Sequence, residues 1–196
     1  LDSMILCSMK KPRQINSEKK KVLILYNLAL GDAVMFLDPL KELRMIYNSD
    51  NYKLTVACQK TFSDFFANQQ ICDEVLPLDF SLATVNLKVR RSLFKSLRKI
   101  YYDLVIDPVG CENLTTNVLC TRAAVATEKV GITDMTINNR QCPEWIKKKV
   151  YNRLIEVRQS NIHLISYYGE LIKALGNPFY IPKPAGLRKT ELKVVL

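Results

Sequence analysis

The chain has 196 residues, with 29 Lys and Arg against 19 Asp and Glu, which gives a formal net charge of +10. A hydrophobic share of 48% with only 6 Gly and 8 Pro excludes disordered, collagen-like and low-complexity chains. The positive excess predicts an anionic partner, and composition leaves open whether that is nucleic acid, an acidic membrane surface or an acidic or phosphorylated small molecule.

The ends and the cysteines exclude further classes. Residues 1–20 form a basic N-terminal extension whose apolar cluster is too short for a signal peptide. No apolar run reaches the roughly 20 residues of a membrane span. The six cysteines and single histidine lack the clustered pairs of a structural zinc site, so we expect no metal. Scattered cysteines without an export signal indicate buried, reduced thiols and a cytoplasmic protein.

The first predicted element is a buried strand at residues 22–26, a continuous apolar run of the kind that is covered on both faces of a parallel sheet. A turn follows at 27–31, and residues 32–47 have the apolar spacing of a helix. Further strands are predicted at 52–57, 73–78, 103–107 and 128–132, and further helices at 61–68, 89–100, 113–124 and 162–175.

This alternation of strands and helices indicates βαβ units, and hence an α/β fold with a Rossmann-like, doubly wound parallel sheet over residues 21–182. Residues 133–150 fit a long loop or a short helix. Residues 183–196 resemble a linker followed by the first residues of another strand. We therefore expect a second domain to begin there.

The turn after the first strand is the main candidate for a functional site, because ligands of open parallel sheets bind at the carboxyl ends of the strands. Gly31 stands alone there, without G-x-G-x-x-G or a phosphate loop, so the turn is not expected to cradle a nucleotide. It does offer Asp32 at the start of a helix, where the helix dipole favours the ionised carboxylate. Such a carboxylate can accept a proton from a substrate hydroxyl. Capping or balancing the helix is the structural alternative.

The basic residues are concentrated at 88–99. Lys88, Arg90 and Arg91 lie at the start of a predicted helix, at the ligand edge of the sheet, where arginine can clamp phosphate or carboxylate. The later cations of this helix, at positions 95, 98 and 99, are expected to form a solvated face.

Two other polar residues are weaker candidates. His163 is expected to pack or to cap a helix rather than to catalyse. Asp107 ends a predicted buried strand and is expected either to line the cleft or to cap the next turn.

Several blocks of sequence, taken in order, resemble the N-terminal half of glycosyltransferase family 9, the bacterial heptosyltransferases. The resemblance covers about residues 20–182, and its most specific part is a strand followed by L-G-D and an apolar helix. The blocks are KVLILYNLALGDAVMFLDPLKELRMIY, CDEVLPLD, YYDLVIDPVG, EKVGI and HLISYYGELIKALG. The resemblance implies the acceptor-binding N-terminal domain of a two-domain GT-B enzyme. The nucleotide-sugar donor, ADP-heptose in this family, would be bound by a C-terminal domain that this sequence lacks.

Site roles follow from the resemblance. Asp32 would be the general base of an inverting transfer that needs no metal or other cofactor, with Gly31 beside it. The acidic sugar and phosphates of a lipopolysaccharide-type acceptor would be held by Lys88, Arg90, Arg91 and Arg122. One departure concerns Gly110, which is followed by Cys111-Glu112-Asn113 where the family often has a basic residue and a serine. This departure points to a different acceptor sugar.

The preferred hypothesis is therefore half of a glycosyltransferase of lipopolysaccharide or surface-glycan synthesis, which we expect to transfer nothing on its own. Trp145 with the three lysines at 147–149 leaves peripheral contact with the inner face of the inner membrane open. The alternative is a non-catalytic module of the same fold that binds an anionic glycan. A nucleic-acid-binding domain is disfavoured, because no recognition motif or aromatic platform accompanies the basic residues.

Overall fold

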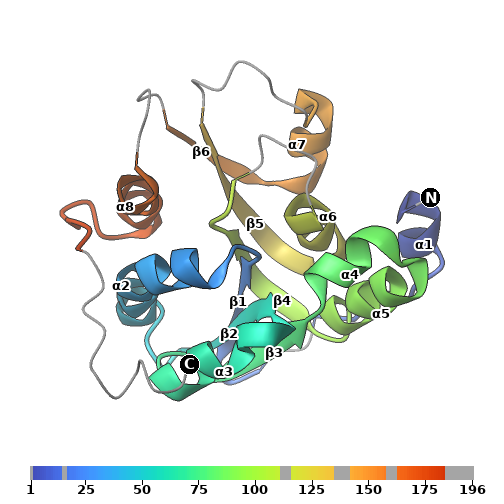
Figure 1. Ribbon diagram of the computed structural model, residues 1–196, viewed down its shortest axis with the longest axis horizontal. Coiled ribbons are helices and arrows are strands. Elements are labelled where there is room, and N and C mark those ends of the chain that lie inside the picture. Colours follow the sequence, from blue (N-terminus) through green and yellow to red (C-terminus); the bar gives the residue numbers. More distant parts are fainter. Residues whose placement is uncertain (1, 15–16, 111–115, 135–141, 158–162, 184–196) are drawn as a thin grey trace.

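The computed structural model describes residues 2–14, 17–110, 116–134, 142–157 and 163–183. Six strands form one sheet in the order β3-β2-β1-β4-β5-β6, and all neighbouring pairs are parallel (Figure 1). The strands are β1 (Lys20–Tyr26), β2 (Tyr52–Gln59), β3 (Glu74–Leu78), β4 (Tyr101–Asp107), β5 (Val125–Asp134) and β6 (Arg153–Val157). The helices are α1 (Asp2–Cys7), α2 (Leu30–Ile46), α3 (Ser63–Gln69), α4 (Phe80–Val85), α5 (Leu87–Leu97), α6 (Thr116–Ala123), α7 (Glu144–Val150) and α8 (Leu164–Leu175), with a 3₁₀ turn at Lys60–Phe62. The predicted doubly wound parallel sheet is confirmed.

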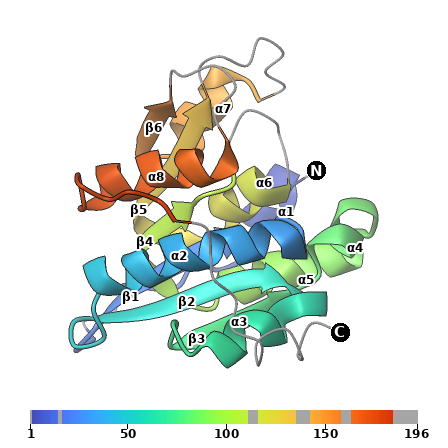
Figure 2. The ribbon, with the colours of Figure 1, turned by 60° about the vertical axis from the view of Figure 1, so that its left-hand side comes forward.

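Helices cover the sheet on both faces (Figures 1 and 2). In β1, Ile24 and its alternate neighbours pack against α2 and α8, whereas Leu23 and Leu25 pack against α5 and α6. Every side chain from Val22 to Tyr26 is without exposed surface, which explains why this run is apolar without alternation. The two cores therefore lie on opposite faces of the central strands.

Residues 2–7 form a helix that the sequence pattern does not predict. Leu6 of α1 is buried in the core shared with α5 and α6. The carboxylate of Asp2 is 3.1 Å from a terminal nitrogen of Arg90 on α5. Figure 1 shows α1 beside α4, α5 and α6. The first residues of the basic extension are thus part of the covering layer of the domain.

Two further elements differ from the sequence prediction. The single helix expected at 89–100 is preceded by α4, because Asp79 accepts a hydrogen bond from the backbone of Leu82 and Asn86 restarts a helix by accepting from Lys88 and Val89. In the described part of 133–150, α7 is the short helix that was one of the two expectations, and the unpredicted strand β6 follows at the edge of the sheet. This strand has exposed polar residues and little apolar alternation, so its pattern gives no strand signal.

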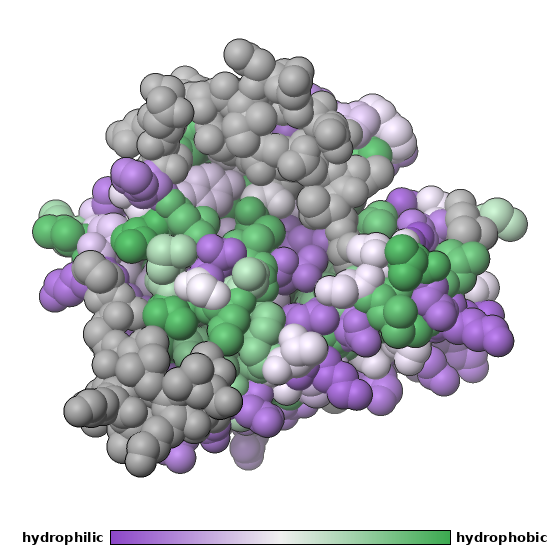
Figure 3. All heavy atoms as spheres, in the orientation of Figure 1, coloured by the Kyte–Doolittle hydropathy of each residue, from purple (hydrophilic) through white to green (hydrophobic). Residues whose placement is uncertain are grey.

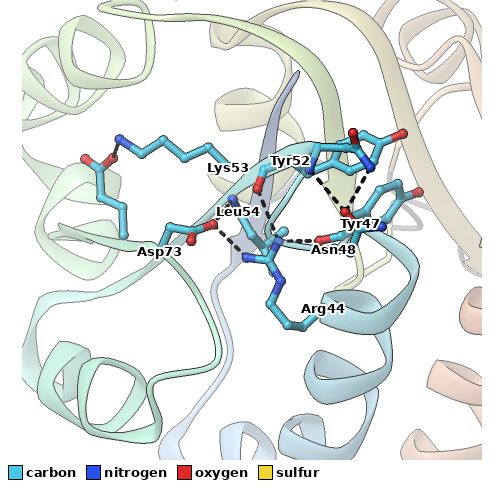
Figure 4. Close-up of polar contacts among 9 residues, drawn as sticks. Arg44, Tyr47, Asn48, Tyr52, Lys53, Leu54 and Asp73 are labelled. Atoms are coloured by element: carbon cyan, nitrogen blue, oxygen red, sulfur yellow. Dashed lines mark hydrogen bonds and ion pairs between the residues drawn. The ribbon is translucent and has the colours of Figure 1, made fainter. Parts of the chain in front are cut away.

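The C-terminal end of α2 is fixed near the amino ends of β2 and β3 (Figure 4). Arg44 is 2.6 Å from Asp73 and donates to the carbonyls of Tyr47 and Tyr52, while Asp73 accepts from the backbone of Leu54. Burial acts to raise the pKa of Asp73, but the bonds from Leu54 and Arg44 outweigh it and the pKa is lowered. This anchor leaves the N-terminus of α2 at the opposite, carboxyl edge of the sheet.

We expect Gly131→Ala to destabilise the protein. A Cβ at Gly131 on β5 would lie 2.6 Å from the ring of Tyr151, so that ring would have to move. Overpacking of this kind lowers the free energy of unfolding by about 1–3 kcal/mol, which urea denaturation would measure. Gly31→Ala is the matched control, since nothing lies within 4 Å of a Cβ there, and we expect a change within about 0.5 kcal/mol. Equal losses in the two variants would contradict this account.

Candidate functional site

Two carboxylates lie at the carboxyl edge of the sheet, one at the end of β4 and one shortly after the neighbouring strand β1. Asp107 is the last residue of β4, and Asp32 lies in the first turn of α2, shortly after the end of β1. Strands β1 and β4 are paired, with Ile24 opposite Ile106, so they end side by side. Ligands of open parallel sheets bind at this edge. The two carboxylates differ in the hydrogen bonds that they accept, and this difference indicates different roles.

Asp107 is held by the fold. Its side chain has no exposed surface and accepts hydrogen bonds from the backbone of Val109 at 3.1 Å, the hydroxyl of Thr121 at 3.3 Å and the hydroxyl of Tyr151 at 2.5 Å. The side-chain amide of Asn117 donates to the same carboxylate. These donors join β4 to α6 and to the chain after α7. Of the two roles expected for Asp107, capping the next turn is therefore confirmed.

Asp32 is half-buried and makes no hydrogen bond or ion pair with any described residue. The N-cap residue Ala29 supplies no side-chain cap to α2. The space beside the neighbouring Gly31 is open, because no atom lies within 4 Å of the place where its Cβ would be. No capping contact therefore explains Asp32, and the interaction of its carboxylate with the helix dipole remains as its only structural role. The carboxylate is free to accept a hydrogen bond from a ligand.

An aromatic floor lies beneath this helix end. The hydroxyls of Tyr26 on β1 and Tyr168 on α8 are 3.3 Å apart and share a hydrogen bond. Phe36 stacks on Tyr26 with ring centroids 4.7 Å apart and meets the ring of Tyr168 edge-on at 5.0 Å. Burial raises the pKa of both tyrosines, and the charge of Asp32 acts in the same direction on each. Both hydroxyls therefore stay protonated in the field of Asp32.

Sequence reasoning missed this tyrosine pair, because its members are 142 positions apart. One signal was available. Tyr26 ends a strand that is aliphatic from Val22 to Leu25, which places a polar tip at the ligand edge. Tyr168 gives no such signal within its helix.

The structure gives Arg90 structural partners. Its Nε donates to the carbonyl of Ala83 at 2.7 Å and one terminal nitrogen donates to Thr84 at 2.6 Å, while the other contacts Asp2. All three nitrogens are therefore engaged in joining α4, α5 and α1. The structure thus offers no support for an acceptor contact by Arg90.

Arg122 is not brought to Asp32. It lies near the end of α6, three residues before β5 begins at Val125, opposite the first residue of β4. This position is toward the amino edge of the sheet, and its guanidinium donates to the hydroxyl of Ser3 at 2.9 Å. By contrast, Lys88 and Arg91 are exposed on α5 without an ion pair to any part of the chain that the structure describes.

Two expectations about other side chains need correction. His163 occupies the N-cap position of α8, but its side chain is exposed and makes no cap hydrogen bond, so it neither packs nor caps. Lys147 is not part of an exposed basic run, because its side chain is 1% exposed and pairs with Glu144 at 2.9 Å. Lys149 lies 5.1 Å from the ring of Trp145, which is exposed.

The cysteines agree in part with expectation. Cys58, Cys120 and Cys142 are buried, Cys72 is half-buried and Cys7 is exposed, while Cys111 lies outside the described residues. Burial raises the pKa of Cys58 to about 12. Within the described ranges, no cluster of potential metal ligands is found, and no helix is long and apolar enough to cross a membrane.

Comparison with solved structures places the fold. A family 9 glycosyltransferase from Veillonella parvula matches with a TM-score of 0.65 at 13% identity, covering 90% of this chain and 47% of that one. The E. coli heptosyltransferase WaaC with ADP matches with 0.62 at 20% identity, covering 84% and 50%. The chain has the fold of family 9 glycosyltransferases. E. coli ADP-heptose lps heptosyltransferase II also matches, with 0.54 at 14% identity, covering 89% and 49%.

These likenesses confirm the predicted fold class, a Rossmann-like domain of the GT-B type. The chain spans about half the length of the glycosyltransferases it matches, consistent with an N-terminal half. No family model and no curated protein matches the sequence.

We expect the two carboxylates to differ in their contribution to stability. In Asp107→Asn, the new side-chain NH₂ group would face the groups that now donate to the carboxylate. This buried conflict between donors is expected to lower the free energy of unfolding by about 1–3 kcal/mol. Asp32→Asn breaks no hydrogen bond to the described residues, so we expect a change within about 0.5 kcal/mol. Urea denaturation of both variants checks this difference. If Asp32→Asn costs as much as Asp107→Asn, a structural contact holds Asp32 and the assignment is wrong.

Proposed function

We propose that this chain is the acceptor-binding half of an inverting, heptosyltransferase-like glycosyltransferase of lipopolysaccharide or surface-glycan synthesis. The observation that carries the proposal is Asp32, a carboxylate at the ligand edge of a glycosyltransferase fold that makes no hydrogen bond to any residue the structure describes. A non-catalytic glycan-binding module would use the same carboxylate only to accept a hydrogen bond from a sugar hydroxyl, so a turnover assay separates the two functions. The proposal therefore assigns a chemical step to this half of the enzyme.

Asp32 acts as the general base. Its carboxylate takes the proton of an acceptor hydroxyl while the hydroxyl oxygen attacks the anomeric carbon of the donor sugar. The new glycosidic C–O bond forms as the bond from that carbon to the nucleotide diphosphate breaks, and the electron pair leaves with the diphosphate. A single displacement of this kind inverts the anomeric centre and needs no protein nucleophile.

The residues around Asp32 suit this step. The bare Gly31 leaves open space at the first turn of α2, so an acceptor can approach the helix end closely. The aromatic floor of Tyr26, Phe36 and Tyr168 keeps the helix end in place from below. Lys88 keeps its proposed role toward the anionic groups of the acceptor. Arg90 and Arg122 are no longer proposed for this role, because contacts with α1 engage their guanidiniums.

We further propose that a second domain binds a nucleotide-sugar donor, such as ADP-heptose. The E. coli WaaC structure contains ADP, and this chain matches half of that protein. Contact of the whole enzyme with the inner face of a membrane remains a proposal based on Trp145 and the two exposed lysines beside it.

The test is Asp32→Asn in the protein that contains this chain, assayed for heptose transfer from ADP-heptose to a lipopolysaccharide acceptor. Loss of a general base lowers kcat by roughly 10²–10⁴-fold, and we expect the acceptor Kd to stay within about threefold. Asp64→Asn is the matched control, because Asp64 is an exposed carboxylate in the first turn of α3. It should retain wild-type turnover.

Three outcomes would contradict the proposal. Turnover unchanged by Asp32→Asn would remove the general base. An equal loss in Asp64→Asn would mean that a general effect of charge is responsible. Acceptor binding by a wild-type protein that transfers no sugar would favour the non-catalytic module.

A further inference from the structure

A basic pocket lies away from the candidate active site, between the segment that follows α1 and the C-terminal half of α5. Its volume is about 420 Å³. The residues that line it are Met9, Lys10, Arg91, Lys95, Arg98 and Lys99. Because α5 ends at Leu97 and β4 begins at Tyr101, most of these residues lie toward the amino edge of the sheet, opposite Asp32. Of the described lining residues, five are cationic and none is acidic.

Arg98 is the residue that makes this pocket unusual. It was expected on a solvated helix face, but the structure shows it only 8% exposed. Its Nε is buried and has no hydrogen-bond partner in the part of the chain that the structure describes. Burial lowers the pKa of Arg98. Buried arginines are almost always paired, because an uncompensated buried charge is costly.

The excess of positive charge extends beyond the pocket wall. Burial lowers the pKa of Lys129 on β5 to about 8, and the charges of Arg98, Lys11 and Arg122 act in the same direction. These cations come from the N-terminal segment, the end of α5, α6 and β5. Within the described part of the chain, none of these four cations forms an ion pair with an acidic side chain. The fold thus gathers cations from four elements without neutralising them.

The N-terminal segment completes the pocket. Met9 and Lys10 follow α1, which is held in place by buried Leu6 and by the contacts of Asp2 with Arg90 and of Ser3 with Arg122. Two of the predicted acceptor-binding arginines therefore fix α1, and α1 in turn places one wall of this pocket. The pocket does not depend on Asp32 or on the proposed transfer reaction.

We propose that this pocket binds a phosphate group. Guanidiniums of Arg91 and Arg98 suit bidentate recognition of phosphate oxygens, and the lysines add point charges at the rim. A multiply charged anion there would offer acceptor oxygens to the guanidinium of Arg98, whose Nε has no partner among the described residues. The phosphate could belong to a soluble phosphorylated molecule or to an anionic lipid headgroup. Exposed Leu82, Val85 and Leu87 lie near the junction of α4 and α5, at the other end of α5 from Arg98, and Figure 3 shows hydrophobic residues beside hydrophilic ones on this side of the molecule.

Calorimetric titration of the 196-residue chain with inorganic pyrophosphate is the first arm of the test. We expect saturable binding at one site and at least a tenfold weaker affinity in both Lys95→Glu and Arg98→Gln, which corresponds to about 1.4 kcal/mol. Lys95 is exposed, so its variant keeps the test valid if Arg98→Gln folds poorly. Lys41→Glu is the matched control, an equal change of charge at an exposed lysine of α2 on the other face of the sheet, and should stay within twofold.

Vesicles of phosphatidylcholine with and without phosphatidylglycerol form the second arm. Pyrophosphate binding that is lost in Lys95→Glu supports the pocket with a soluble source. Binding only to phosphatidylglycerol vesicles, lost in Lys95→Glu but retained in Lys41→Glu, supports the pocket with a lipid source. Failure to bind either probe overturns the proposal. Equal weakening by Lys95→Glu and Lys41→Glu also overturns it, because net charge would then explain the attraction.

Lys129 gives an independent pH readout of the same cluster. Its pKa is about 8 in the folded chain, below the ordinary value of about 10.4, so the unfolded chain binds more protons between these two pH values. The free energy of unfolding contributed by this group therefore rises with pH across that window. We expect the difference in unfolding free energy between wild type and Lys129→Met to show this rise, and saturating pyrophosphate to flatten it. A difference that does not change with pH would contradict the lowered pKa of Lys129, to which both burial and the neighbouring cations contribute.

Discussion

A parallel sheet must be covered on both faces, and this requirement decides where the polar side chains of the candidate site can lie. In β1 the five residues from Val22 to Tyr26 have no exposed surface, so none of these five side chains is available to a ligand. Functional groups are left to the edge where the strands end. At that edge the fold uses Asp107 to join β4, α6 and the chain after α7, and it leaves Asp32 without such contacts.

The need to cover the sheet also explains where the basic residues Arg90 and Arg122 lie. Helix α1 buries Leu6 on the face of α5 and α6, and it is held there by Arg90 and Arg122. These arginines contribute to packing instead of facing the ligand edge. Arg91 and Lys95 of α5 lie with Lys10 in a separate positive pocket toward the opposite edge, together with Arg98 and Lys99 just after the helix. The basic residues at 88–99 are therefore divided between the structural contacts of Arg90, the proposed acceptor role of Lys88 and a candidate site for phosphate.

The elements that could be predicted from the sequence are those whose residues follow a regular apolar pattern or a short motif. The apolar run of β1, the spacing of α2 and the aspartate after L-G are visible in the sequence, and the structure places them as expected. Strand β6 escaped prediction because an edge strand needs few apolar residues. The roles of Arg90 and Tyr168 escaped it because their partners, Asp2 and Tyr26, are 88 and 142 positions away. Only the folded chain brings these pairs together.

The central claim is that Asp32 is free to accept the proton of an acceptor hydroxyl. The most direct measurement is a crystal structure of the protein with an acceptor glycan bound. The account predicts one sugar hydroxyl within about 2.6–3.2 Å of an Asp32 carboxylate oxygen, directed toward the open space beside Gly31. An acceptor bound with no hydroxyl in reach of Asp32, directly or through one water, would contradict it.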